Sequence, residues 1–345
     1  MYCRPAPSRK FADKFRIMEY RRLGKSGLKV SALSFGSWVT FGKQIGDNTA
    51  SDLMTMAYDN GVNFFDNAEI YARGRSELVM GEILKKNAWS RSSYILSSKV
   101  FFGYEEDKPN QTGLSRIHIM EGCHAALRRL QVDYIDLFFC HRPDKNTPIE
   151  ETVWTMNHLI QQGKILYWGT SEWANDEIMA AHVFAEKNHL IGPSMEQPQY
   201  NMFERTKMEK DYLLLFRDWG MGTTIWSPLS SGLLSGKYNH AQPEDNRLNI
   251  AGMDWLKDRT LGDPSKIEKT RQLELLAKEM GISLPRLAIA WCLKNPNVST
   301  AILGASKTEQ LKETITSLDV LPLLTDEIVA KIEGILQNAP LQAPY

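Results

Sequence analysis

Several features that would assign this chain to a particular class are missing from it. Its 345 residues contain no run of about 18 apolar residues, so we expect no transmembrane helix and no membrane insertion. Lys plus Arg and Asp plus Glu number 41 each, so no excess charge favours nucleic acid as a partner. The N-terminus is basic and polar and lacks the apolar stretch of a secretory signal.

Cysteine is scarce as well. The four cysteines are far apart and show neither a CxxC pair nor the spacing of metal ligands. In a large chain without a secretory signal they are expected to be reduced thiols, which favours a cytoplasmic protein without a metal site. Cys140 precedes His141, and strand alternation predicts that the two side chains point to opposite faces, with Cys140 in the core.

Two common nucleotide-binding motifs are also absent. An open doubly wound sheet that binds dinucleotides would show GxGxxG after its first strand, and none occurs. The segment that most resembles a phosphate-binding P-loop, 232–238, has the wrong glycine spacing and Tyr238 where Ser or Thr is required. We therefore reject both hypotheses.

What the chain does show is a regular alternation of short apolar runs and amphipathic stretches, without a linker that would separate two domains. Alternating βα units predict a parallel sheet, and eight of them predict a closed (β/α)₈ (TIM) barrel. The strands are expected at 32–35, 62–65, 94–98, 134–139, 166–169, 194–197, 222–226 and 300–303. The helices between them are expected at 51–60, 76–86, 115–130, 150–162, 175–188 and 209–219.

The two ends of the chain add further elements. Tyr20–Val30 alternates around a Lys-Ser-Gly turn, which predicts a β-hairpin that plugs the barrel floor. Amphipathic helices are expected at 283–295 and 325–337, around or beyond the last strand. We expect residues 1–17 to form a flexible arm and residues 18–345 a single barrel domain.

Four side chains that suit proton transfer come at or after the ends of consecutive strands. Asp66 follows the strand 62–65, Tyr71 comes five residues later, and Lys99 and His141 end the next two runs. Tyrosine has an ordinary pKa of about 10, so as an acid it needs a nearby cation and a carboxylate to hold that cation. The active sites of such barrels lie at these strand ends.

These properties predict a role for each residue. Tyr71 would be the general acid that protonates a carbonyl oxygen, and Lys99 would lower its pKa. Asp66 would orient Lys99, and His141 would donate a hydrogen bond to the same oxygen. Each residue alone has a structural explanation, as a cap, a surface aromatic, a solvated cation or a packed histidine. Their common placement favours a catalytic site.

In type and order these residues resemble the catalytic tetrad of the aldo-keto reductase family. The resemblance runs from about Met18 to Leu336 and is strongest to the branch of the voltage-gated potassium channel β subunits and their bacterial reductase relatives. It implies an NADPH-dependent oxidoreductase that reduces aldehydes or small ketones to alcohols. The segments that carry it lie at 36–42, 61–71, 139–148, 167–171, 196–201, 226–229 and 304–307.

The same branch implies an alternative, a nucleotide-binding regulatory subunit that docks on a channel as a redox sensor. The channel subunits carry Asn at the position of His141 and Arg at the position of Glu172. The first difference favours an active reductase, and the second removes one cofactor contact and weakens the channel hypothesis. The branch also implies a homo-oligomer, a tetramer or a larger ring.

The resemblance further implies that NADPH or NADP⁺ lies extended across the barrel mouth. Ser171 and Gln197 would face the nicotinamide carboxamide, while Ser306 and Lys307, with Arg247, would face the 2′-phosphate. A capping box between Ser306 and Glu309 is a compatible structural explanation for the last segment. The implied cofactor-binding set is Ser37, Trp38, Gln44, Asp66, Ser171, Gln197, Trp226, Ser227, Pro228, Leu229, Ser231, Gly232, Lys237, Arg247, Gly304, Ser306, Lys307, Gln310 and Glu313.

The substrate would be a small carbonyl compound. Loops 101–111 and 200–210 are rich in aromatic residues, and Trp38 and Trp173 are near them in the predicted fold. These residues predict an aromatic-lined pocket, although they could equally pack the loops against the barrel.

Overall fold

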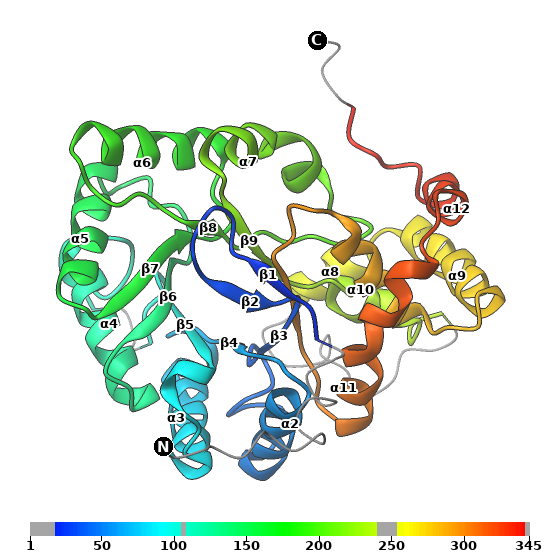
Figure 1. Ribbon diagram of the computed structural model, residues 1–345, viewed down its shortest axis with the longest axis horizontal. Helices are drawn as coiled ribbons and strands as arrows, with labels where there is room; N and C mark the ends of the chain where they lie inside the picture. Colours follow the sequence, from blue (N-terminus) through cyan, green and yellow to red (C-terminus); the bar gives the residue numbers. More distant parts are fainter. Residues whose placement is uncertain (1–17, 105–107, 240–253, 342–345) are drawn as a thin grey trace, which may run out of the picture.

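The computed structural model describes residues 18–104, 108–239 and 254–341, and the N-terminal residues 1–17 lie outside this range. Its centre is a closed barrel of eight parallel strands, with helices around it (Figure 1). Around the barrel the strands follow the order β10-β3-β4-β5-β6-β7-β8-β9. The predicted (β/α)₈ fold class is therefore confirmed.

Every predicted strand overlaps an observed one. At the end of the barrel where the strands finish, Gly36 of β3 pairs with Asp66 of β4, and Lys99 of β5 pairs with Phe139 of β6. The barrel strands are β3 (Leu33–Gly36), β4 (Phe64–Asp66), β5 (Ile95–Val100), β6 (Ile135–Cys140), β7 (Ile165–Thr170), β8 (Met195–Glu196), β9 (Gly222–Ile225) and β10 (Thr300–Leu303).

The helices cover the outside of the barrel. Most agree with the predicted ranges, but the stretch predicted at 209–219 begins as a π-helical turn, Lys207–Asp211, and becomes α-helical only after Tyr212. The helices are α2 (Asp47–Asp59), α3 (Arg75–Asn87), α4 (Arg116–Leu130), α5 (Ile149–Gln161), α6 (Asn175–Lys187), α7 (Leu213–Trp219), α8 (Asp254–Leu261), α9 (Pro264–Glu279), α10 (Leu284–Lys294), α11 (Thr308–Thr314) and α12 (Asp326–Leu336).

The core has two layers because side chains alternate across each strand. In β6, Leu137 and Phe139 belong to a cluster inside the barrel, whereas Phe138 and Cys140 pack in the layer between strands and helices. The predicted core position of Cys140 is thus confirmed. Within the described ranges the cysteines are buried free thiols, and Cys3 lies outside them.

An antiparallel hairpin closes the barrel end at which the strands begin. Its strands are β1 (Tyr20–Arg22) and β2 (Lys29–Ser31), and Figure 1 views the barrel from the hairpin side. Leu23 and Val30 are fully buried among the interior residues. Gly222 at the start of β9 lies so close that a Cβ there would be 2.6 Å from the Leu23 carbonyl carbon. The predicted plug is confirmed.

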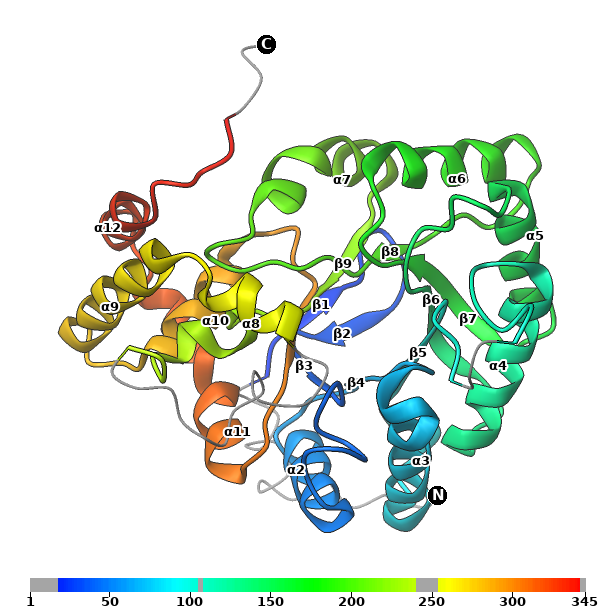
Figure 2. The same cartoon turned by 180° about the vertical axis from the view of Figure 1, so that it is seen from behind.

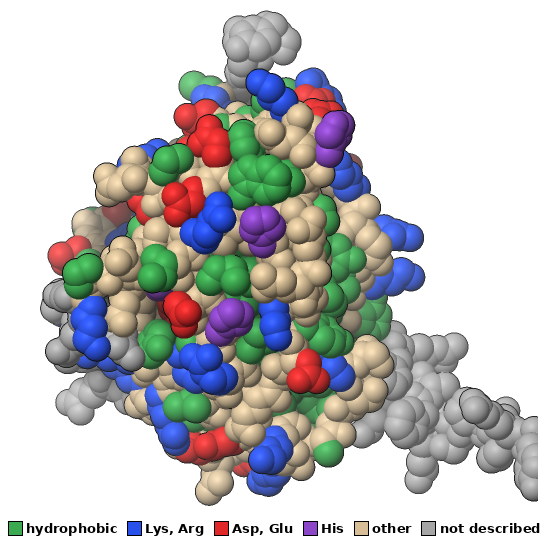
Figure 3. Space-filling model, turned by 90° about the vertical axis from the view of Figure 1, so that its left-hand side faces the viewer, with side chains coloured by type: hydrophobic (Ala, Val, Ile, Leu, Met, Phe, Trp, Pro, Cys, Tyr) green, Lys and Arg blue, Asp and Glu red, His purple; other side chains and the backbone are tan. Residues whose placement is uncertain are grey.

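The opposite end, seen in Figure 2, carries the longer loops. On the side that Figure 3 shows, acidic, basic and hydrophobic side chains are interspersed, as the balanced composition predicts. In the described ranges, no helix combines the length and the apolar character that a membrane span requires.

Candidate active site

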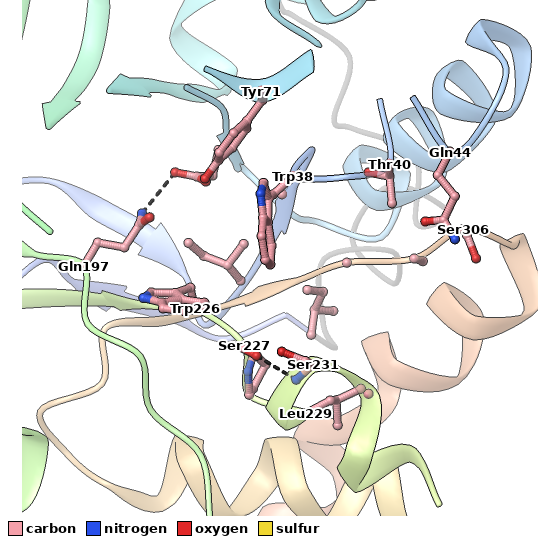
Figure 4. A pocket seen from close by; sticks show the side chains of 18 of the residues that line it. Trp38, Thr40, Gln44, Tyr71, Gln197, Trp226, Ser227, Leu229, Ser231 and Ser306 are labelled. Atoms are coloured by element: carbon pink, nitrogen blue, oxygen red, sulfur yellow. Dashed lines mark hydrogen bonds between the residues drawn. The ribbon is translucent and has the colours of Figure 1, made fainter. Parts of the chain in front are cut away.

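A cavity of about 570 Å³ opens at the end of the barrel where the strands finish. Figure 4 shows Tyr71, Gln197 and Trp226 on one side of it and Gln44 and Ser306 on the other. Each of the eight barrel strands supplies lining residues from its end or from the loop that follows it, and β5 does so only through Phe102. This is the position expected for the active site of such a barrel.

Asp66, Lys99 and Tyr71 form one hydrogen-bonded chain beside the cavity. Asp66 is the last residue of β4, and its Oδ2 lies 2.7 Å from the Nζ of Lys99. The same ammonium donates to the carbonyl of Asn67 at 2.7 Å and to the hydroxyl of Tyr71 at 3.1 Å. Lys99 is completely buried, so its three donors are all satisfied by protein oxygens.

The carboxylate of Asp66 has further donors on its other oxygen. Ser97 Oγ donates to Oδ1 at 2.8 Å, and Gln197 Nε2 donates to it at 3.0 Å (Figure 4). Gln197 also donates to Thr224 Oγ1 at 3.2 Å. Ser97 of β5 and Gln197, which follows β8 and is tied to β9 by Thr224, therefore fix the carboxylate, which in turn fixes Lys99.

Burial controls the titration of Tyr71. Loss of hydration raises the pKa of its phenol well above the ordinary value, Asp66 raises this pKa further, and the Arg142 guanidinium lowers it. Lys99 was predicted to lower the pKa of Tyr71, but the net shift is upward because desolvation of the phenolate is the largest effect. Tyr71 is therefore protonated at neutral pH, as a proton donor must be.

His141 follows β6 and lies near Tyr71, with the two ring centroids 5.9 Å apart. Burial, together with the charges of Lys99 and Arg142, lowers the pKa of His141 well below its ordinary value, so the imidazole is neutral. Its Nδ1 is buried and has no hydrogen-bond partner in the described protein. Since buried polar atoms are normally paired, a neutral ring with an unpaired nitrogen fits a site that receives a polar ligand atom.

Most of the predicted cofactor-binding residues line this same cavity. Ser171 Oγ donates to the Gln197 carbonyl at 2.9 Å, which ties the ends of β7 and β8 together. The Trp38 and Trp226 rings meet edge to face at 6.1 Å. The predicted residues found on the wall are Trp38, Gln44, Asp66, Tyr71, His141, Ser171, Gln197, Trp226, Ser227, Pro228, Leu229, Ser231, Gly232, Lys237, Gly304, Ser306, Lys307 and Gln310.

Of the predicted cofactor-binding residues that the structure describes, Ser37 and Glu313 are not on the wall. Ser37 turns inward, and its hydroxyl donates to the Asp66 carbonyl at 3.0 Å, so it holds the ends of β3 and β4 together. Glu313 lies on α11, where Thr314 reaches the cavity instead. Arg247 lies outside the described residues.

The capping box predicted between Ser306 and Glu309 is wrong by one residue. Helix α11 begins at Thr308, and the side chain of Gln310, not Glu309, accepts from the backbone. Its Oε1 accepts from Ser306 N at 2.9 Å and from Lys307 N at 3.2 Å. Gln310 thereby shapes the segment that presents Ser306 and Lys307 to the cavity.

Glu172, the residue that departs from the channel subunits, does not line the cavity but supports its wall. Its Oε1 accepts from Trp226 Nε1 at 2.9 Å and from Gln199 N at 2.5 Å. Its Oε2 accepts from Lys207 at 2.7 Å, and this cation is one reason why the pKa of Glu172 is lowered. Glu172 therefore positions Trp226.

The sequence analysis missed several wall residues. One of them, Arg142, is a cation that directly follows His141. A cation next to a histidine at the end of a strand was the sequence feature that could have predicted its place on the wall. Of the aromatic residues predicted for a substrate pocket, only Trp38 and Phe102 face the cavity. The residues not predicted for the site are Gly36, Thr40, Ile70, Arg142, Ser235, Trp255, Ile302, Leu303, Ala305 and Thr314.

The site divides along the chain. The four predicted catalytic residues, Asp66, Tyr71, Lys99 and His141, belong to β4, β5, β6 and their loops, whereas the remaining polar wall comes mainly from the segments after β7 to β10 and β3. Over the described ranges, no cluster of His, Cys, Asp and Glu could hold a metal ion.

Comparison with known proteins agrees with this arrangement. Residues 32–337 match the model of the aldo/keto reductase family. A "Probable voltage-gated potassium channel subunit beta" from Arabidopsis thaliana is 49% identical over 324 residues, covering 94% of this chain and 98% of that protein. A protein of the same name from Oryza sativa subsp. japonica is 48% identical over the same share of each chain. The chain belongs to the aldo/keto reductase family.

Proposed function

We propose that the protein is an NADPH-dependent oxidoreductase that reduces aldehydes or small ketones to alcohols. The observation that carries this proposal is the buried chain Asp66–Lys99–Tyr71, which ends at the cavity that His141 also lines. A protonated phenol held by an ammonium, next to a neutral imidazole, suits donation of a proton to a carbonyl oxygen. Family membership supports the same reaction class.

The four residues divide the work at the carbonyl oxygen. Nicotinamide, when bound, supplies the hydride that reduces the carbonyl carbon. Tyr71 gives its proton to the oxygen, and the ammonium of Lys99, 3.1 Å from the phenol oxygen, stabilises the phenolate that remains. Asp66 keeps Lys99 charged and oriented through its 2.7 Å ion pair. His141 donates a hydrogen bond that orients the carbonyl group.

The wall residues would hold the cofactor along the cavity. Ser171 and Gln197 would meet the carboxamide, because they lie beside the tetrad, with Trp226 against the ring. Ser227 Oγ already accepts from Ser231 N at 2.8 Å, which leaves its hydroxyl hydrogen to donate to a phosphate. The cations Lys237 and Lys307 suit the phosphate groups.

We expect NADPH to bind at least about tenfold more tightly than NADH. The 2′-phosphate would meet Ser306 and Lys307, and a charge-assisted hydrogen bond is worth roughly 1.5–3 kcal/mol. Fluorescence titration of the protein with both nucleotides measures this ratio. The preference should fall in Lys307→Met and persist in Lys312→Met, which removes a cation from the same helix but away from the cavity wall. Equal affinities in the unmodified protein would contradict the expectation.

Replacing His141 with Asn should lower kcat/KM by up to about 10²–10³-fold, the effect of losing one oxyanion donor. NADPH affinity should be unaffected, because His141 is assigned to the substrate oxygen. A matched control is His158→Asn, because His158 lies next to Trp154 in α5, with the two rings tilted at 44°, and does not line the cavity. If the alkaline limb of the kcat/KM profile disappeared in His141→Asn and remained in Tyr71→Phe, the two roles would be reversed.

Oxidation of NADPH by the purified protein with a panel of aldehydes and ketones tests the proposal itself. The names of the two plant relatives favour the second hypothesis, a nucleotide-binding β subunit of a potassium channel that senses redox state. Tight NADPH binding without turnover of any carbonyl compound would favour that hypothesis. Turnover that depends on Tyr71 would favour the enzyme.

A further inference from the structure

Arg142 is a half-buried cation on the same wall as the proposed catalytic residues. It directly follows His141 on the loop after β6 and lines the cavity. Its charge lowers the pKa of Tyr71, Lys99 and His141. The Phe102 ring next to the guanidinium lies 5.1 Å from the His141 ring. The proposed reaction gives Arg142 no task.

The hydrogen bonds of Arg142 use only part of the guanidinium. Nη1 donates to the carbonyl of His141 at 2.5 Å and, more weakly, to Ser171 Oγ at 3.4 Å. The group also lies 5.7 Å from the centroid of the Phe102 ring. In the described protein Nε and Nη2 donate to no acceptor, and no carboxylate lies within ion-pair distance.

Among the described residues, the other buried or half-buried arginines lie near a carboxylate, although Arg286 reaches Asp319 only at 3.9 Å. Arg91, Arg129 and Arg205 each form a hydrogen-bonded ion pair with a carboxylate. A guanidinium removed from water is normally paired in this way, because the unpaired charge is costly to bury. Arg142, which lines the cavity, therefore lacks an anion that its counterparts have.

The phosphate groups of the cofactor would not supply the anion that Arg142 lacks. Ser306 and Lys307 follow β10, and in the closed barrel β6 is four strands from β10 in either direction. Arg142 is thus across the mouth from the segment assigned to the 2′-phosphate, and next to the residues assigned to the carbonyl group. An anion that Arg142 binds would belong to the substrate.

We propose that Arg142 binds a carboxylate of the substrate, so that the preferred substrates are aldehydes that carry a carboxylate. Planar guanidinium groups bind carboxylates through two parallel hydrogen bonds, here available from Nε and Nη2. This proposal rests on the proposed reductase function and names its substrate class.

The test compares each carboxylate aldehyde with its uncharged primary amide. The pairs are 4-carboxybenzaldehyde with 4-formylbenzamide, and 4-oxobutanoate with 4-oxobutanamide, which differ in the span between the two groups. We expect kcat/KM to favour the carboxylate by about tenfold or more in at least one pair. Arg142→Gln should abolish this preference, and Arg142→Lys should keep part of it because the charge remains.

Taking the ratio within each pair cancels any effect of Arg142 on Tyr71 or Lys99. As a charge control, Arg75→Gln removes an exposed arginine that pairs with Asp47 and does not line the cavity, so the preference should persist. The proposal is overturned if both ratios are near one, or if Arg142→Gln preserves them.

A second measurement separates this proposal from the proposed function. Calorimetric titration of the NADP⁺-saturated protein with benzoate and benzamide tests Arg142 without turnover. Benzoate should bind more tightly, and Arg142→Gln should remove the difference. If none of these aldehydes is reduced, the proposed reductase function is contradicted. The titration still decides whether Arg142 binds carboxylates.

Discussion

Replacing Tyr71 with Phe is expected to lower kcat for carbonyl reduction by about 10²-fold or more, the low end of the contribution of a positioned general acid. Tyr71 lines the cavity, and its hydroxyl accepts a hydrogen bond from the Lys99 ammonium at 3.1 Å. The substitution removes one oxygen and keeps the ring, so NADPH should bind nearly as before. Initial rates with a saturating aldehyde, and NADPH titration by fluorescence, measure the two effects.

The pH profile gives this prediction a second readout. Reduction requires a protonated phenol, and burial raises the pKa of Tyr71, so kcat/KM should fall only at strongly alkaline pH. That limb should be absent in Tyr71→Phe. Tyr20→Phe is a suitable control, because this hydroxyl also makes a hydrogen bond, to Gly61 O at 2.8 Å, but lies in the hairpin at the opposite barrel end. A Tyr71→Phe protein with near-normal kcat would remove Tyr71 from the mechanism.

The second large effect is expected from Asp66→Asn, which should abolish most activity and lower the free energy of unfolding by about 3–5 kcal/mol. The change leaves the ammonium of Lys99 fully buried without its counter-charge. Urea unfolding of the cofactor-free protein, followed by circular dichroism, measures the loss. An Asp66→Asn protein as stable as the original would show that the ion pair does not carry this stability.

The loss of stability should depend on pH in a defined direction. Burial already lowers the pKa of Lys99 below 10.5, and removing Asp66 lowers it further. At pH values between this lowered pKa and 10.5, Lys99 is neutral in the folded variant and protonated in the unfolded chain. The free energy of unfolding of the variant therefore rises with pH, and its difference from the original protein becomes smaller towards pH 10.5. Adding Lys99→Met should restore much of the stability, because the buried charge is gone, but none of the activity.

The sequence was enough to predict the barrel and the common location of the four candidate catalytic residues, because both depend on where strands end. Asp66, Lys99 and His141 lie at or directly after the ends of strands. Short apolar runs predict these ends, and an error of one residue in a predicted end hardly changes where the side chain lies. The hairpin plug was predictable for the same reason, since Leu23 and Val30 are the apolar residues of an alternating pattern.

Features that depend on how a loop folds were not predictable. Ser37 hydrogen bonds to Asp66 O instead of facing the cavity, and its direction is set by a turn with no sequence signature. Gln310 replaced Glu309 in the cap because α11 begins one residue later than predicted. Glu172 was considered only as a lost cofactor contact, since its three donors come from segments distant in sequence.

The division of the site between the two halves of the barrel has a consequence for how such a protein can change. The proposed proton donation uses side chains from β4 to β6, while the surface assigned to the nucleotide comes mainly from the loops after β7 to β10. One substitution in the first group would therefore silence turnover and leave a nucleotide-binding protein whose occupancy still follows the cellular ratio of reduced to oxidised cofactor. For the proposed reductase, a single substitution would thus separate nucleotide binding from catalysis.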